Sequence, residues 1–181
     1  MVDASATRHR AAALVVRPMA RHRMLATGEL RTYFVEPHCA FADRLRARCD
    51  DDIIAAPELC DLREEDTGGR PSDELDPRLL APLNTLWERH VPMPALAALV
   101  GLSPQRLRAL ARQQVGMPLA RWRVWARLRR AAEALQAGES PAGGAAGFAD
   151  QAHLTRGMRE MMGLTPAAVL PALRGHSLRA T

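Results

Sequence analysis

Two stretches of the sequence concentrate side chains that can form paired hydrogen bonds with the edges of nucleic-acid bases. They read "PQRLRALARQQ" (residues 104–114) and "DQAHLTRGMRE" (residues 150–160). A guanidinium group donates two parallel hydrogen bonds to guanine O6 and N7, and a glutamine amide pairs in a similar way with adenine. Gln105 and Arg108 in the first stretch, and Gln151 and Arg156 in the second, therefore carry groups suited to reading a duplex.

The distribution of charge favours a polyanionic partner. All 25 basic residues are arginine, and the formal net charge is +5. Residues 1–75 hold 11 arginines and 14 acidic residues, whereas residues 76–181 hold 14 arginines and 6 acidic residues. A basic part beside an acidic part points to nucleic acid more than to a membrane, with a solvated basic surface as the alternative.

Helical periodicity begins at residue 76 and predicts the elements that would position both stretches. Asp76 can cap a first helix at Pro77, and the apolar face of that helix comprises Leu79, Leu80, Leu83, Leu86 and Trp87. A second, short helix is expected from near Pro94 to Gly101, with Leu96, Ala97, Leu99 and Val100 on its apolar face.

A third helix is expected to start after Ser103 and to bury Leu107, Leu110 and Ala111. Its polar side chains then fall on the opposite face. Two short helices joined by a tight turn that contains glycine form the arrangement that inserts one helix into a major groove.

A longer helix is expected over residues 119–137. Its buried stripe comprises Trp122, Trp125, Leu128, Ala132 and Leu135, which assigns both tryptophans to packing. Its arginines either contact phosphates or form a solvated face. They are Arg121, Arg123, Arg127, Arg129 and Arg130.

The layout of residues 94–116 returns over residues 140–163, where a second reading helix is expected from about Asp150 to Met162. Gly101, Leu102 and Ser103 correspond to Gly147, Phe148 and Ala149, and Gly116 corresponds to Gly163. An internal repeat is stronger evidence than either copy alone.

The segments "LAALVGLSPQRLRALARQQVGMP", "RWRVWARLRRAAEAL" and "GFADQAHLTRGMREMMGLTP" resemble the AraC/XylS family of bacterial transcription regulators over roughly 100 of the 181 residues. The resemblance implies a mainly α fold, with two helix-turn-helix subdomains bridged by a long helix. It implies base-facing positions for Gln105 and Arg108 and phosphate contacts for Arg106 and Arg112. It also implies a second reading face, formed by Gln151, Ala152, Thr155 and Arg156.

Two departures from the family pattern fall in the helical part. Ala109 and Ala111 stand where larger side chains are common, so the first reading helix is expected to pack less tightly. Only "PAGGAA" separates Ser140 from Gly147, about two residues fewer than usual. Glycine weakens a helix interior, so this support helix is expected to be short or frayed and the second unit to be the less rigid one.

The N-terminal part is expected to contain strands near residues 11–17 and 31–36. Residues 11–36, chiefly "RPMARHRM" and "LRTYFVEP", resemble the closing strands of a cupin-like effector domain, which implies that residues 1–49 are the remnant of a truncated sensor. Residues 50–75 are predicted to be an acidic linker. The DNA-binding domain is expected over 76–175, comprising a first unit at 76–117, a bridging helix at 118–137 and a second unit at 138–173.

The hypothesis is a sequence-specific DNA-binding transcription regulator. No catalytic arrangement, cofactor or metal site is expected, because the cysteines (Cys39, Cys49 and Cys60) and histidines lack ligand spacing. The alternatives are a helical interaction or vestigial protein that pairs with another regulator, and a cupin-type metal enzyme.

The expected partner is double-stranded DNA, and the resemblance implies RNA polymerase as a further one. A membrane is not expected, the protein is expected to be cytoplasmic, and a homodimer stays open because the effector domain looks truncated.

Overall fold

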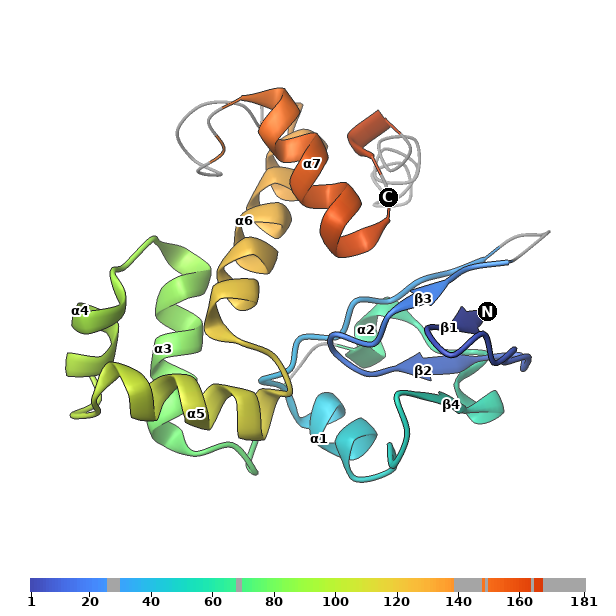
Figure 1. Ribbon diagram of the computed structural model, residues 1–181, viewed down its shortest axis with the longest axis horizontal. Helices are drawn as coiled ribbons and strands as arrows, with labels where there is room; N and C mark the ends of the chain where they lie inside the picture. Colours follow the sequence, from blue (N-terminus) through green and yellow to red (C-terminus); the bar gives the residue numbers. More distant parts are fainter. Residues whose placement is uncertain (26–29, 68–69, 139–147, 149, 164, 168–181) are drawn as a thin grey trace. The chain divides into compact units, whose positions relative to one another are not determined.

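The computed structural model describes residues 1–25, 30–67, 70–138, 148, 150–163 and 165–167 (Figure 1). Contacts divide the chain into two compact units. The first comprises residues 1–83 and 93–118, and the second comprises residues 84–92 and 119–181.

The first unit begins with short antiparallel ladders. Strand β1 (Val2–Asp3) pairs with β3 (His22–Arg23), and β2 (Leu14–Val16) pairs with β4 (Ile53–Ala55). Strand β2 lies within the predicted strand at 11–17. The cupin-like character of this part stays a prediction.

The predicted strand at 31–36 is wrong, because residues 30–36 form no strand. Their side chains pack instead of pairing along a ladder. The Tyr33 hydroxyl donates to the Leu62 carbonyl oxygen at 2.7 Å, and Val35 packs against the buried cluster of Cys39, Phe41 and Ala42.

The stretch 50–75, which we expected to be a linker, contributes buried groups to the first unit. It contains β4, the 3-10 helix η1 (Pro57–Leu59) and helix α2 (Glu64–Thr67). Helix α1 (Ala40–Arg46) buries Asp43, whose carboxylate accepts from the Ser72 hydroxyl at 2.7 Å, the Asp73 N–H at 3.2 Å and the Arg46 guanidinium. Buried carboxylates need such partners, and here residues 72 and 73 supply two of them.

Three helices follow as the periodicity predicted: α3 (Pro77–Glu88), α4 (Met93–Ala98) and α5 (Pro104–Val115). The Asp76 carboxylate accepts from the Arg78 N–H at 2.9 Å at the start of α3. The Asp76 N–H in turn donates to Gln114 of α5 at 2.8 Å.

Helix α4 packs against α5 in the first unit. Leu96 and Ala97 of α4 are buried, as expected, whereas Leu99 is 57% exposed and does not join the core.

The second unit is built on α6 (Leu119–Gln136) and α7 (Gln151–Met162), which pack against each other. Trp122 is fully buried and stacks on Trp87 with 5.6 Å between ring centroids. The predicted role of Trp122 in packing is therefore confirmed.

Several arginines of α6 stabilise the second unit. Arg130 donates to the carbonyl oxygens of Leu86, at 3.3 Å, and of Trp87, and Arg123 donates to that of Val91. Carbonyl groups at a helix C-terminus lack partners within the helix and attract cations. Arg129 lies 4.5 Å from the centroid of the Trp87 ring. Neither of the two expected roles, phosphate contact or solvated face, describes Arg123 and Arg130, whereas Arg129 is exposed, as a solvated face requires.

Candidate nucleic-acid interface

Helix α5 presents its polar side chains to solvent because its other face is fixed in the core. Leu107, Leu110 and Ala111 are buried, as the periodicity predicted. The Ser103 hydroxyl accepts from the Arg106 N–H at 3.2 Å, which caps the first turn. The remaining side chains singled out on this helix are exposed; they are Gln105, Arg106, Arg108 and Arg112.

The helical geometry separates these four residues into two groups. At about 100° per residue, Gln105, Arg108 and Arg112 fall within a stripe roughly 60° wide. Arg106 lies about 100° from Gln105, to one side of that stripe. The stripe can enter a groove while Arg106 reaches the bordering backbone.

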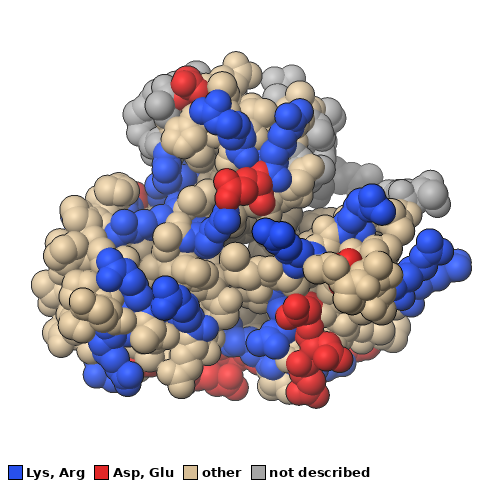
Figure 2. Space-filling view, viewed as in Figure 1, with Lys and Arg blue, Asp and Glu red and all other residues tan. Residues whose placement is uncertain are grey.

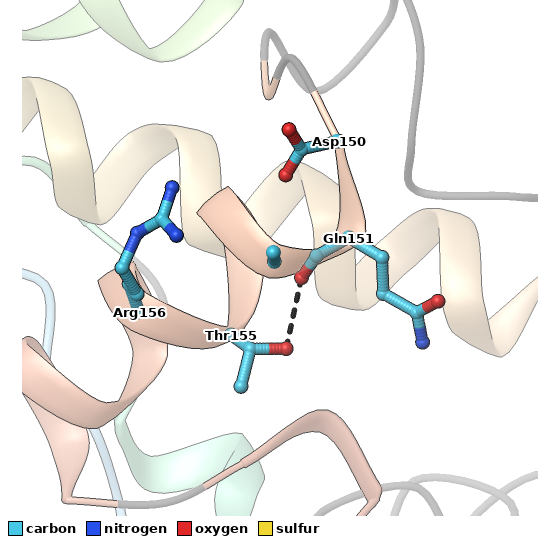
Figure 3. A pocket seen from close by; sticks show the side chains of 5 residues that line it. Asp150, Gln151, Thr155 and Arg156 are labelled. Carbon is cyan, nitrogen blue, oxygen red and sulfur yellow. Dashed lines mark hydrogen bonds between the residues drawn. The ribbon is translucent and has the colours of Figure 1, made fainter.

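Helix α7 begins in a matching way. Asp150 accepts from the His153 N–H at 2.7 Å, and its side chain lines an open hollow together with Gln151, Ala152, Thr155 and Arg156 (Figure 3). The structure therefore brings together the four predicted residues of the second reading face. Gln151, Ala152 and Arg156 are exposed, whereas Thr155 is half-buried.

Two side chains near the start of α7 contact neighbouring groups of the second unit. The Thr155 hydroxyl donates to the Gln151 carbonyl oxygen at 2.8 Å, the bond drawn in Figure 3. Its oxygen is left as an acceptor toward a ligand. The His153 ring packs edge-on against Phe148, with 5.3 Å between ring centroids.

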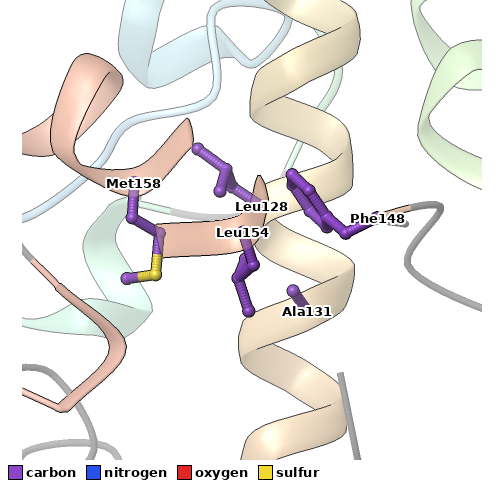
Figure 4. Packing of buried hydrophobic residues seen from close by; sticks show 5 residues of the cluster. All are labelled: Leu128, Ala131, Phe148, Leu154 and Met158. Atoms are coloured by element: carbon purple, nitrogen blue, oxygen red, sulfur yellow. The ribbon is translucent and has the colours of Figure 1, made fainter. Parts of the chain in front are cut away.

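The position of α7 depends on a small apolar cluster in the second unit. Leu154, Met158 and Phe148 pack with Leu128 and Ala131 of α6 (Figure 4). The Arg127 guanidinium lies 4.5 Å from the centroid of the Phe148 ring. Leu154 and Met158 therefore hold α7 on the bridging helix α6. The predicted support helix at 141–146 lies outside the described residues.

The capping residues fix the register between α5 and α7: Ser103 aligns with Asp150 and not with Ala149, as the repeat had paired it, whereas the predicted pairing of Gly116 with Gly163 is confirmed. Ser103 and Asp150 are equivalent caps, and Gly116 and Gly163 end the helices with φ of 74° and 71°, a left-handed conformation that favours glycine. Both pairs are 47 positions apart, whereas Gly101 and Gly147, paired in the repeat, are 46 apart.

This register adds one candidate residue, Arg159. It is the equivalent of Arg112, lies in the last turn of α7 and is exposed. It could have been found from the spacing between the two capping residues. The register also pairs Ala109 with Arg156, so the guanidinium missing from α5 is present at the equivalent position of α7.

The exposed arginines of both helices are available to a ligand. Arg106, Arg108, Arg112, Arg156 and Arg159 form no ion pair with any residue that the structure describes. Figure 2 shows arginine side chains at the surface over the regions of α5 and of α7. A hydrogen bond from Arg78 lowers the pKa of Asp76, and the charge of Arg106 adds to that shift.

Other classes of site find little support in the part of the chain that is described. No group of three or more histidine, cysteine or acidic side chains is placed there to hold a metal ion. Among the same residues, no helix is both long and apolar enough to cross a membrane.

Comparison with known families matches residues 96–171 to a family described as a helix-turn-helix domain. No curated protein matches the sequence. Two solved structures are similar. One is a transcriptional regulator from Chromobacterium violaceum, described as containing an AraC-type DNA-binding domain, with 22% identity, a TM-score of 0.45, and coverage of 58% of this chain and 96% of that one. The other is the C-terminal domain of AraT, a response regulator from Geobacillus stearothermophilus, with 16% identity, a TM-score of 0.45, and coverage of 57% and 88%.

Proposed function

We propose, from the match of residues 96–171 to a helix-turn-helix domain, that this chain is a sequence-specific DNA-binding transcription regulator of AraC/XylS type. Helices α5 and α7 would enter adjacent major-groove segments of one duplex. The domain match supports DNA binding and regulation, and it favours a regulator over an enzyme.

The observation that carries the proposal is the repetition of one design at a spacing of 47 residues. In each copy a side-chain cap starts the helix, a fully buried leucine (Leu107 or Leu154) fixes its rotation, and glycine ends it. In each copy the exposed side chains include arginines that form no ion pair with a residue that the structure describes. An exposed helix presented in this way is the element that reads a major groove.

We assign base contacts to Gln105 and Arg108 on α5 and to Gln151 and Arg156 on α7, because amide and guanidinium groups discriminate base pairs. Ala152 would contact a thymine methyl group, and Thr155 would accept from a base amino group. Arg106 and Arg112 would bind phosphates, which position the protein without specifying sequence. Arg159 joins them as the equivalent of Arg112.

The alternative is a helical protein that pairs with another regulator and no longer binds DNA. It would form no specific complex with a duplex at moderate salt. As a regulator, the chain would act in the cytoplasm and contact RNA polymerase, and homodimer formation would depend on the N-terminal part.

Selection of binding sites from random duplexes, run at two salt concentrations, tests the proposal. We expect one enriched sequence with two short conserved blocks. Its affinity should fall steeply with salt, because arginine contacts to phosphates release counterions. Failure to enrich any sequence at the lower salt concentration would contradict the proposal.

A further inference from the structure

Four arginines near the start of the chain are exposed and have no role in the proposed interface. Residues 1–35 hold six arginines and two acidic residues, whereas residues 36–75 hold five arginines and twelve acidic residues. The basic character of the chain is therefore not confined to its helical part. The four arginines form no ion pair or side-chain hydrogen bond with any residue that is described; they are Arg8, Arg10, Arg21 and Arg23.

Arginines later in the first unit differ, because most of them lie beside a carboxylate. The pairs are Arg46 with Asp43, Arg48 with Glu58, Arg63 with Glu65 and Arg70 with Asp73. Arg8, Arg10, Arg21 and Arg23 have no such pair with a residue that the structure describes, which leaves positive charge there that a polyanion could neutralise.

Backbone pairing brings two of the four arginines to one face. Val2 pairs with Arg23 of β3 and, on its other side, bridges to Arg8. Directly opposed residues of antiparallel strands project from the same face, so Arg8 and Arg23 flank Val2. Neighbouring strands are about 4.8 Å apart, so the two outer strands are roughly 10 Å apart. Alternation along extended chain assigns Arg10 and Arg21 to the same face.

The carboxylate of Asp3, in the same pair of strands, belongs to the other face. Asp3 pairs with His22, and its carboxylate lies 2.8 Å from Nε2 of His9 and accepts from the Ser5 and Thr7 N–H groups at 2.9 Å each. The hydrogen bond with His9 is the main reason that the pKa of Asp3 lies well below its usual range. The charge of Asp3 is thus held among its own neighbours and not beside the arginines.

Within the first unit, the segment between β2 and β3 lies beside the end of α5. Gly116, the C-cap of α5, lies beside Pro18: a Cβ atom added to Gly116 would be 3.8 Å from Cγ of Pro18. Arg21 and Arg23 follow Pro18 by three and five residues, at most about 11 and 18 Å of extended chain. Arg112, a proposed phosphate contact, lies in the last turn of the same helix.

From this arrangement we infer that Arg8, Arg10, Arg21 and Arg23, the N-terminal arginine face, bind backbone phosphates of duplex DNA beyond the segment that α5 contacts. The inference rests on the proposed function and extends it. Figure 2 shows arginine side chains at the surface of the part that holds the strands. An anionic lipid surface is the rival partner, because Met19, Met24 and Leu25 are exposed nearby.

The test compares two double variants of the full-length chain with equal loss of charge. R8Q/R23Q removes two members of the face. R63Q/R70Q removes two exposed arginines of the same unit that lie beside carboxylates. The affinity of each is measured between 50 and 200 mM salt on the selected duplex, both at minimal length and extended by about one turn, roughly 10 bp, on each side.

On the extended duplex, R8Q/R23Q should lower the salt slope of log affinity by about 1.8, since each phosphate contact contributes about 0.9. The loss of affinity between 50 and 200 mM salt would then be about twelvefold smaller than for the wild type. R63Q/R70Q should match the wild type, R8K/R23K should retain the slope, and the minimal duplex should not distinguish the variants.

Each contrary outcome has a separate meaning. If the wild type binds specifically but R8Q/R23Q behaves like R63Q/R70Q on the extended duplex, this inference fails and the proposed function stands. If vesicles that contain phosphatidylserine bind the wild type but not R8Q/R23Q, with unchanged DNA slopes, the partner is lipid and the inference fails. If the wild type binds no duplex, both fail.

Discussion

Two arginines on one stripe of α5 are expected to differ in what they contribute to binding. Arg108 lies on the second turn and Arg112 on the last, and both are exposed. The first is within reach of base edges when the start of the helix enters a groove, and the second is nearer to the backbone. Their side chains are identical, so position alone distinguishes their roles.

We expect Arg108→Ala to cost about 1–3 kcal/mol on the selected duplex and to relax the preference at one base pair. Arg112→Ala should weaken binding to all sequences alike. Titrations with the selected duplex and with a random duplex check both variants. Equal losses on the two duplexes for both variants would contradict the assigned roles.

A half-buried histidine, His38, makes the stability of the first unit depend on pH. Burial lowers the pKa of His38, although the Glu36 carboxylate lies 3.4 Å from its Nε2 atom. The unfolded chain therefore takes up a proton at a higher pH than the folded chain. Stability should be fully present above about pH 6.5, the usual value for histidine, and decrease as pH falls toward the lowered pKa.

His38→Gln should flatten this part of the curve. Melting temperatures of both proteins between pH 7.5 and 5, with His90→Gln as an exposed control, provide the measurement. A wild type and variant that lose stability in parallel over this range would show that His38 is not responsible.

At the scale of elements, each reading helix depends on one capping side chain. Ser103→Ala and Asp150→Ala should each destabilise the protein by about 1 kcal/mol, because a backbone N–H in the first turn loses its acceptor. Denaturant unfolding measures the change, with Gln113→Ala on the exposed surface of α5 as the control. Losses no larger than the control's would mean that the caps do not hold the helices.

The support of α7 is a second question at this scale. Gly143 and Gly144 weaken any helix over residues 141–146, while Leu154 and Met158 pack on α6. We therefore expect amide hydrogens at 141–147 to exchange faster than those at 95–100. Hydrogen exchange of the full chain measures both segments, and equally slow exchange would show that the second unit is as well supported as the first.

Across the whole molecule, periodicity and turn residues predicted the helical part well. The helices α3 to α7 start and end near the predicted residues, because Pro77, Ser103 and the glycines at 116 and 163 are local signals that need no distant contact. The eight candidate site residues followed from the same periodicity combined with the family resemblance.

The N-terminal part could not be predicted in this way. Strand β2 pairs with Ile53–Ala55, almost forty residues further along the chain. The buried Asp43 carboxylate accepts a hydrogen bond from the Ser72 hydroxyl. Such partners are chosen by tertiary packing, which local patterns do not encode. Arg159 was missed because the two copies of the repeat differ by one residue ahead of the cap.

The most direct test of the central claim is protection of guanine N7 from methylation on the selected duplex, because N7 lies in the major groove. With the wild type we expect two protected clusters about 10 bp apart, one for each reading helix. Arg108→Ala should remove protection from one cluster only, and Arg156→Ala from the other only. A single protected cluster, or loss of the same protection in both variants, would contradict the account.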